Sequence, residues 1–317
     1  MSLGSLVGFG VLAVLLMTMF SLVSAAVVVL AREPLRRAGP AAERRAMAWA
    51  LGGPSALCFA IVVLLAARGS GGVDHCIDHR HHAHLCLVHG AEWLERPWAV
   101  ALAIGSAITM LLRFGVVILR HVRTTLAVTR VRKVAQLVGG VRIARSDRSF
   151  VFVAGWRSPE VFVSSRAWEV LSSCEREAVL AHEHAHVAHG DLWLRSVLDV
   201  AGVFTAPLVG SWLHAWWADA SERLCDVRAA ERTGPETVAS ALVRLARAGT
   251  PQLVPSGFTP AAEALDRRVR GVLRGGPTGE RVAHRVALLG GVLLLGLIGI
   301  VAVLAPALHH ALETLLG

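Results

Sequence analysis

Four long apolar stretches constrain this chain more than any other feature of its sequence. They cover about residues 6–30, 48–67, 98–119 and 286–308. Each is close to the roughly 20 residues that a helix needs to cross the hydrocarbon core of a bilayer. A cleaved signal peptide is an alternative for the first stretch, but no positive charge precedes it and it is longer than the apolar core of such peptides. We therefore expect four transmembrane helices, the first of them an uncleaved anchor.

The composition also indicates a membrane protein, because 54% of the 317 residues are apolar and only 17% are charged, against about 25% charged in soluble domains. The formal net charge of +9 would suit nucleic acid, anionic lipid or the topology of a membrane protein. The arginines flank the apolar stretches without any nucleic-acid-binding signature. We expect the lipid bilayer as their partner and no direct contact with nucleic acid.

The arginines also predict the orientation of the chain. They cluster at residues 32–45 and 120–133, whereas the loop 68–97 holds few of them. Because basic loops stay in the cytoplasm, we expect the loop 68–97 and both chain ends outside the cell. Arg113 lies near the far end of the third stretch, and its long side chain is expected to extend toward the membrane surface.

This topology divides the chain into three parts. Residues 1–120 hold three helices and the outside loop, and residues 286–317 hold the fourth helix and a short outside tail. Residues 121–285 are the only large tract between spans and are long enough for a folded cytoplasmic domain. The fold class is thus a mainly α membrane protein with a separate domain.

Short strands are predicted at the start of that domain. Residues 141–144 and 150–154 flank a turn-prone segment, and residues 161–163 form a third β-rich run. Pro159 precedes the third run, and proline is confined to sheet edges or strand starts. We expect an α+β domain in which residues 161–163 lie at the edge of the sheet.

A helix with a metal-binding pattern follows. Ser172 and Glu175 have the spacing of a capping box, and residues 182–186 form an H-E-x-x-H motif with His182, Glu183 and His186. Two histidines four residues apart lie on one face of a helix and can reach a single ion. Zinc suits two nitrogen ligands plus a carboxylate, and Glu183 would deprotonate the attacking water in peptide hydrolysis.

A third ligand is expected on a later helix. Glu222 is the candidate, and Asp226, one turn further on, could accept a hydrogen bond from a ligating histidine. A solvated helix with paired charges is the alternative for this segment. His189 shares the metal-facing side of the first helix, so it is either a neighbour of the site or a ligand in place of Glu222.

The apolar residues 197–217 lie between these two helices. A complete membrane crossing there would place Glu222 and His182 on opposite sides of the membrane, where they could not share an ion. We therefore expect either a buried core helix or a re-entrant pair broken near Pro207 and Gly210.

The chain resembles the BlaR/MecR-type integral-membrane zinc metallopeptidases, the β-lactam-sensing antirepressor receptors and their relatives. Besides four spans, the resemblance is carried by residues 150–164, His182-Glu183-x-x-His186, Gly190-Asp191, Glu222-x-x-Cys225-Asp226 and Leu265-Asp266-Arg267-Arg268. It implies zinc bound by His182, His186 and Glu222, with Glu183 as general base and Asp226 as orienting group.

The resemblance further implies a zincin-like (minigluzincin) domain in the bacterial cytoplasmic membrane, with a transcriptional repressor as substrate. The edge strand near residues 161–163 would align that substrate by strand addition. Sensor members of the family carry a penicillin-binding domain after the last span, whereas here only residues 309–317 follow. We therefore expect the signal to come from a separate partner or from the outside loop.

The outside loop is rich in histidine and cysteine. It includes Cys76, Cys86, His75, His79 and His82. A disulfide between the cysteines with solvated histidines is the favoured interpretation in an oxidising compartment. A metal or pH sensor is the alternative, because such side chains bind metals and histidine titrates near neutrality.

Three functions are consistent with these features. A regulatory zinc endopeptidase of the H-E-x-x-H type, cleaving a cytoplasmic protein or itself, explains the most of them. A quality-control protease of the HtpX type is the second, and a non-catalytic sensor or scaffold is the third.

Overall fold

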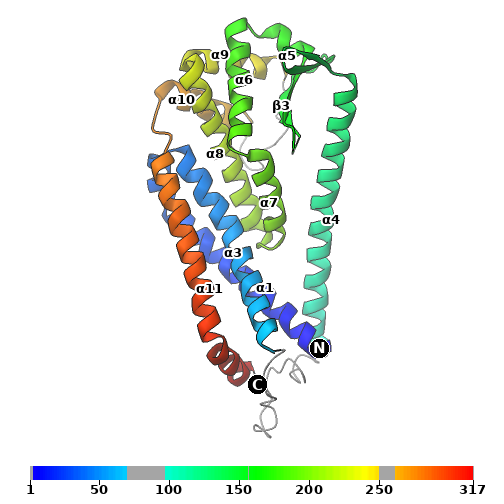
Figure 1. The fold of residues 1–317 in the computed structure, drawn as a ribbon, viewed down its shortest axis with the longest axis vertical. Helices are drawn as coiled ribbons and strands as arrows, with labels where there is room; N and C mark the ends of the chain where they lie inside the picture. The colour runs from blue at the N-terminus through cyan, green and yellow to red at the C-terminus, as the bar shows by residue number, and fades with distance from the viewer. Residues whose placement is uncertain (1–2, 70–96, 156, 250–260, 317) are drawn as a thin grey trace.

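A computed structural model describes residues 3–69, 97–155, 157–249 and 261–316 as a bundle of long helices with a small sheet at one end (Figure 1). The helices are α1 Leu3–Leu30, α2 Arg32–Ala38, α3 Pro40–Gly69, α4 Pro97–Val134, α5 Ser165–Val170, α6 Ser173–Ala188, α7 Asp191–Val203, α8 Pro207–Thr233, α9 Pro235–Arg247, α10 Ala261–Arg274 and α11 Glu280–Leu316. The strands are β1 Gln136–Val138, β2 Val141–Ala144, β3 Val151–Ala154 and β4 Glu160–Ser164.

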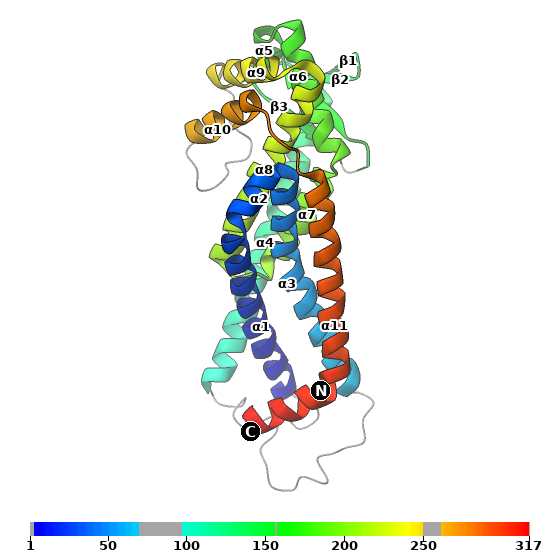
Figure 2. The same ribbon diagram turned by 90° about the vertical axis from the view of Figure 1, so that its left-hand side faces the viewer.

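Three of the described helices are long and apolar enough to cross a membrane. Their apolar windows are Ala13–Leu30 in α1, Val100–Val134 in α4 and Glu280–Ile300 in α11. Few side chains in these windows are buried within the protein, as expected for helices that face lipid. The remaining predicted span, residues 48–67, falls in α3, which packs along α1 and α11 (Figure 2); its role as a fourth span stays a prediction.

Helix α4 departs from the expected domain division. It runs without a break from Pro97 to Val134 and ends two residues before β1. Figure 1 shows it standing apart from α11 on the other side of the bundle. The predicted boundary after residue 120 therefore falls inside one continuous helix.

The strands predicted at residues 141–144 and 150–154 are confirmed as β2 and, one residue shorter, β3. The sheet order is β1-β2-β4-β3, with β2 and β4 parallel and the outer pairs antiparallel. The edge position expected for residues 161–163 is wrong, because β4 pairs on both sides. Pro159 precedes the first strand residue, so it removes no bond from the ladder.

The apolar segment 197–217 is divided into two helices with a break next to Pro207, where one of the two alternatives placed it; the re-entrant path of the pair stays a prediction. Helix α7 ends at Val203, and α8 begins at Pro207, a residue favoured in the first turn of a helix. Gly210 lies inside α8, where an added Cβ would meet the Thr205 Oγ1 atom at 2.1 Å. The turn is therefore closed tightly against the start of α8.

The α7–α8 turn is held by polar groups of three other helices. Ser21 of α1 accepts a hydrogen bond from the amide of Ala206, and Ser55 of α3 donates one to the carbonyl of Ala201. Arg113 of α4 donates to the carbonyls at the end of α7. The side chain expected to extend toward the membrane surface is thus bound to the carbonyls of Gly202 and Thr205, near the end of a helix where carbonyls lack intrahelical partners; its position relative to the membrane surface stays a prediction.

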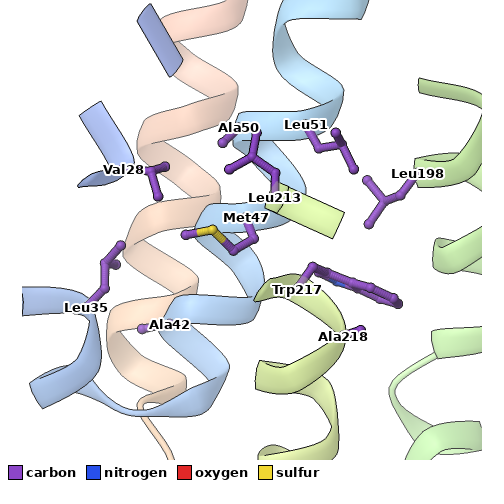
Figure 3. Packing of buried hydrophobic residues seen from close by; sticks show 10 residues of the cluster. All are labelled: Val28, Leu35, Ala42, Met47, Ala50, Leu51, Leu198, Leu213, Trp217 and Ala218. Atoms are coloured by element: carbon purple, nitrogen blue, oxygen red, sulfur yellow. The ribbon is translucent and has the colours of Figure 1, made fainter. Parts of the chain in front are cut away.

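The largest buried cluster joins α3 to the α7–α8 pair (Figure 3). Met47 and Leu51 of α3 lie against Leu213 and Trp217 of α8, and Trp217 is only 1% exposed. Burial of an indole ring of that size contributes on the order of 4 kcal/mol. The first turns of α3 are thus a fixed part of the support beneath the helices that carry the predicted site.

Candidate metal centre

Helix α6 begins at the predicted capping box. The Ser172 amide donates to Glu175 Oε2 at 2.8 Å, and the Glu175 amide donates to Ser172 Oγ at 3.4 Å. Both hydrogen bonds satisfy amides that lack partners at a helix start. The start of α6 therefore fixes the rotation of the helix that carries the H-E-x-x-H motif.

Three side chains from α6 and α8 converge. His182 Nε2 lies 3.2 Å from His186 Nε2 and 3.5 Å from Glu222 Oε2, and His186 Nε2 lies 3.6 Å from Glu222 Oε1. Two ligands of a tetrahedral zinc ion are separated by about 3.3 Å, given zinc–nitrogen bonds of about 2.0–2.1 Å. The donor atoms and their spacing fit zinc.

Each histidine is oriented by a buried carboxylate on its other ring nitrogen. His182 Nδ1 lies 2.9 Å from Asp226 Oδ1, and His186 Nδ1 lies 2.7 Å from Asp191 Oδ2. A carboxylate there favours the tautomer that leaves Nε2 free for a metal. Asp226 was predicted in this role. Asp191 was not, although it directly follows Gly190, whose φ of +65° separates α6 from α7.

Two arginines hold these carboxylates. Arg268 of α10 donates two hydrogen bonds of 2.7 Å to Asp226, and its Nη1 atom lies 3.0 Å from Glu222. Arg44 of α3 forms an ion pair with Asp191. We refer to Asp226 and Arg268 as the α10 pair, and to Asp191 and Arg44 as the α3 pair. Each pair compensates a buried negative charge that would otherwise be costly.

The charges leave the site suited to a cation. Burial lowers the pKa of His182, but its hydrogen bonds with Asp226 and Glu222 outweigh this and raise the pKa to about 10. Burial raises the pKa of Glu222, but Arg268 and the histidines hold it well below the usual range. The carboxylates around His182 therefore favour positive charge at this position, as a metal site requires.

Glu183 has the properties of a proton acceptor beside this group. It is 8% exposed, and burial together with the charge of Glu222 raises its pKa, against the opposing effect of His182 and His186. A raised carboxyl pKa lies closer to the neutral range in which general acid–base groups work best.

His189 lies outside the group formed by His182, His186 and Glu222. It is the residue at the end of α6, and its Nδ1 atom lies 3.9 Å from Cys225 Sγ. The structure thus brings Glu222, and not His189, to the histidine pair.

A second possible ligand group overlaps the first and consists of His186, Asp191 and Cys225. Its histidine and carboxylate already bond to each other. Burial raises the pKa of the Cys225 thiol well above its ordinary value, whereas metals bind the thiolate. The first group is therefore the better metal site. The predicted loop residues Cys76, Cys86, His75, His79 and His82 lie outside the described residues.

Residues 139–251 match the family model described as Peptidase family M48. No curated protein and no solved structure matches the chain. The matched segment contains both α6 and α8, and therefore all three converging side chains. The match supports a membrane-type metallopeptidase, for which zinc is the usual metal.

Proposed function

We propose that this chain is a membrane-anchored zinc endopeptidase of the H-E-x-x-H type, with His182, His186 and Glu222 as ligands and Glu183 as general base. The observation that carries the proposal is the convergence of two imidazole nitrogens and a carboxylate beside a buried glutamate. The family match over the same residues supports it.

Zinc, when bound, supplies a Lewis acid that activates water and polarises the peptide carbonyl. Glu183 accepts the proton of the attacking water and passes it to the leaving amine. Its burial raises its pKa, which suits a group that accepts a proton and then releases it. Asp226 and Asp191 keep the ligand rings in one orientation throughout, so the site is assembled before substrate arrives.

The sheet offers a surface on which to align an extended substrate. β3 is an outer strand of the described sheet and packs near α6, which carries the motif. A peptide could pair with the outer edge of Val151–Ala154 by strand addition. This role moves from residues 161–163, where the sequence placed it, because that strand is enclosed by its neighbours.

We further propose that the domain faces the cytoplasm and cleaves a repressor-like protein or the chain itself in response to a signal. The arginine clusters at residues 32–45 and 120–133 support this orientation. The resemblance to the BlaR/MecR type supports the class of substrate. A quality-control protease of the HtpX type would use the same site but would cleave many unfolded membrane proteins instead of one regulator.

Cleavage of casein, and of the chain itself, by the purified full-length protein in detergent micelles tests the catalytic proposal. We expect Glu183→Gln to lower the rate by at least about 100-fold, since general-base groups contribute about 10²–10⁴. A chelator should abolish cleavage and added zinc should restore it. Glu177→Gln is the matched control, because Glu177 is exposed on the same helix. Unchanged activity in Glu183→Gln would refute the mechanism and favour a non-catalytic sensor or scaffold.

A further inference from the structure

Arg44 connects α3 to three of the helices around the metal centre, α6, α7 and α8. Its side chain is 7% exposed, although it belongs to a cluster of arginines that the sequence assigns to membrane topology. Its Nε donates to Ser221 Oγ of α8 at 3.0 Å, and its Nη2 donates to the carbonyl of His189 at the end of α6 at 3.1 Å. The same Nη2 donates to Asp191 at the start of α7.

Asp191 shares its two oxygens between this arginine and the proposed ligand. Oδ1 accepts from Arg44, and Oδ2 accepts from His186 Nδ1. The Arg44 guanidinium therefore fixes Asp191 through Oδ1, and Asp191 in turn fixes the imidazole of His186 through Oδ2. Charge-assisted bonds of this kind are short and strongly directional.

Helix α3 is itself attached firmly to α8. Glu43, next to Arg44, is completely buried and accepts two hydrogen bonds of 3.0 Å from Arg223 and one of 2.6 Å from Trp216 Nε1. Adjacent residues of α3 thus hold α8 through a carboxylate and the metal centre through a guanidinium. Met47 is buried against the same region. These contacts fix the segment of α3 that carries Arg44.

We propose that Arg44 is a positioning residue for the metal centre. Through Asp191 it sets the orientation of His186, so that one of the proposed ligands is oriented from helix α3. This inference rests on the proposed zinc site. The other histidine is oriented from within the domain by the α10 pair. Of the two histidines, α3 therefore reaches only His186 through an orienting carboxylate, and a shift of the start of α3 would loosen His186 while leaving the contact of His182 with Asp226 in place.

Zinc affinity of the full-length protein in micelles, measured by competition with a chromophoric chelator, tests this role. Loss of a group that orients a ligand typically weakens metal binding by about 10–100-fold. We expect a loss of zinc affinity in that range for Asp191→Ala and of about 10-fold for Arg44→Met. The loss should be smaller for Arg44→Lys, which keeps the positive charge but not the planar guanidinium with its several N–H donors. Arg45→Met is the matched control, because Arg45 is the exposed neighbour.

The double variant separates positioning from general support. If Arg44 acts through Asp191, Arg44→Met combined with Asp191→Ala binds zinc as Asp191→Ala does. If the two losses multiply, or if Arg44→Met binds like the wild type, the inference is overturned. Cobalt spectra of Arg44→Lys provide a second measurement should Arg44→Met not fold: a spectrum unchanged from the wild type also overturns it. Failure of the wild type to bind zinc would instead overturn the proposed function.

Discussion

The two proposed histidine ligands are oriented by the same chemistry from different parts of the molecule. The α10 pair lies within the domain and contacts both His182 and Glu222. The α3 pair contacts His186 and joins it to α3, which packs along α1 and α11. Arg268 holds the proposed ligand Glu222 as well as the orienting carboxylate Asp226. Arg44 holds one orienting carboxylate, and its other bonds go to Ser221 and the His189 carbonyl, which are not proposed ligands.

The largest effect should come from removing the arginine of the α10 pair. Arg268→Met leaves the buried carboxylate of Asp226 without its cation, and loss of one partner of a buried ion pair costs about 3–5 kcal/mol. We expect a destabilisation of that size in denaturant unfolding of the metal-free protein. Arg270→Met is the control, since its exposed pair with Asp266 contributes below about 0.5 kcal/mol. Equal destabilisation by Arg268→Met and Arg270→Met would contradict the structural role of the α10 pair.

A smaller loss is expected at the far end of α7, the helix that begins with Asp191. Arg113→Leu removes the donor of the Thr205 carbonyl, whereas the Gly202 carbonyl still accepts from Thr205, and an unsatisfied buried group costs about 1–3 kcal/mol. We expect about 2 kcal/mol lower stability in micelles, with a modest fall in zinc affinity. Arg123→Leu, at an exposed position of the same helix, should change neither. A stable Arg113→Leu protein would show that the turn does not need this anchor.

Local signals allowed part of the site to be predicted. The capping box, His182, His186 and Glu183 follow from spacings within one helix, and two strands follow from short β-rich runs. Asp191 could have been suspected from its position, because a glycine break directly after a metal-binding helix keeps the next carboxylate close to the last histidine of the motif, five residues away.

The arginines of the site could not be predicted from spacing. Arg44 lies 147 positions from Asp191, and Arg268 lies 42 positions from Asp226. In the sequence, Arg44 cannot be told from its exposed neighbour Arg45. Pairing order was equally hidden, because β4 lies between β2 and β3 through a parallel pairing with β2, and no local pattern in the sequence indicates that pairing.

A substitution that overpacks the turn between α7 and α8 should lower the stability less than the loss of Arg113 does. Gly210→Ala would place a Cβ 2.1 Å from Thr205 Oγ1, and overpacking of this kind typically costs about 1–3 kcal/mol. The threonine can rotate away, so we expect the lower end of that range in unfolding experiments. Combination with Thr205→Ala should recover part of the loss. Gly202→Ala is the control for helix propensity, since nothing lies within 4 Å of its added Cβ.

The smallest effect should separate the contacts of Arg44 from one another. Ser221→Ala removes only the hydroxyl that accepts from Arg44 Nε and leaves the bond to Asp191 in place. Loss of one such hydrogen bond costs about 1 kcal/mol of stability, and zinc affinity should change less than about 3-fold, well below the 10-fold loss typical when an orienting group is removed. Chelator competition on both variants measures this. A loss in Ser221→Ala equal to that in Arg44→Met would mean that the packing of α3 on α8, and not the carboxylate, transmits the influence of the membrane region to His186.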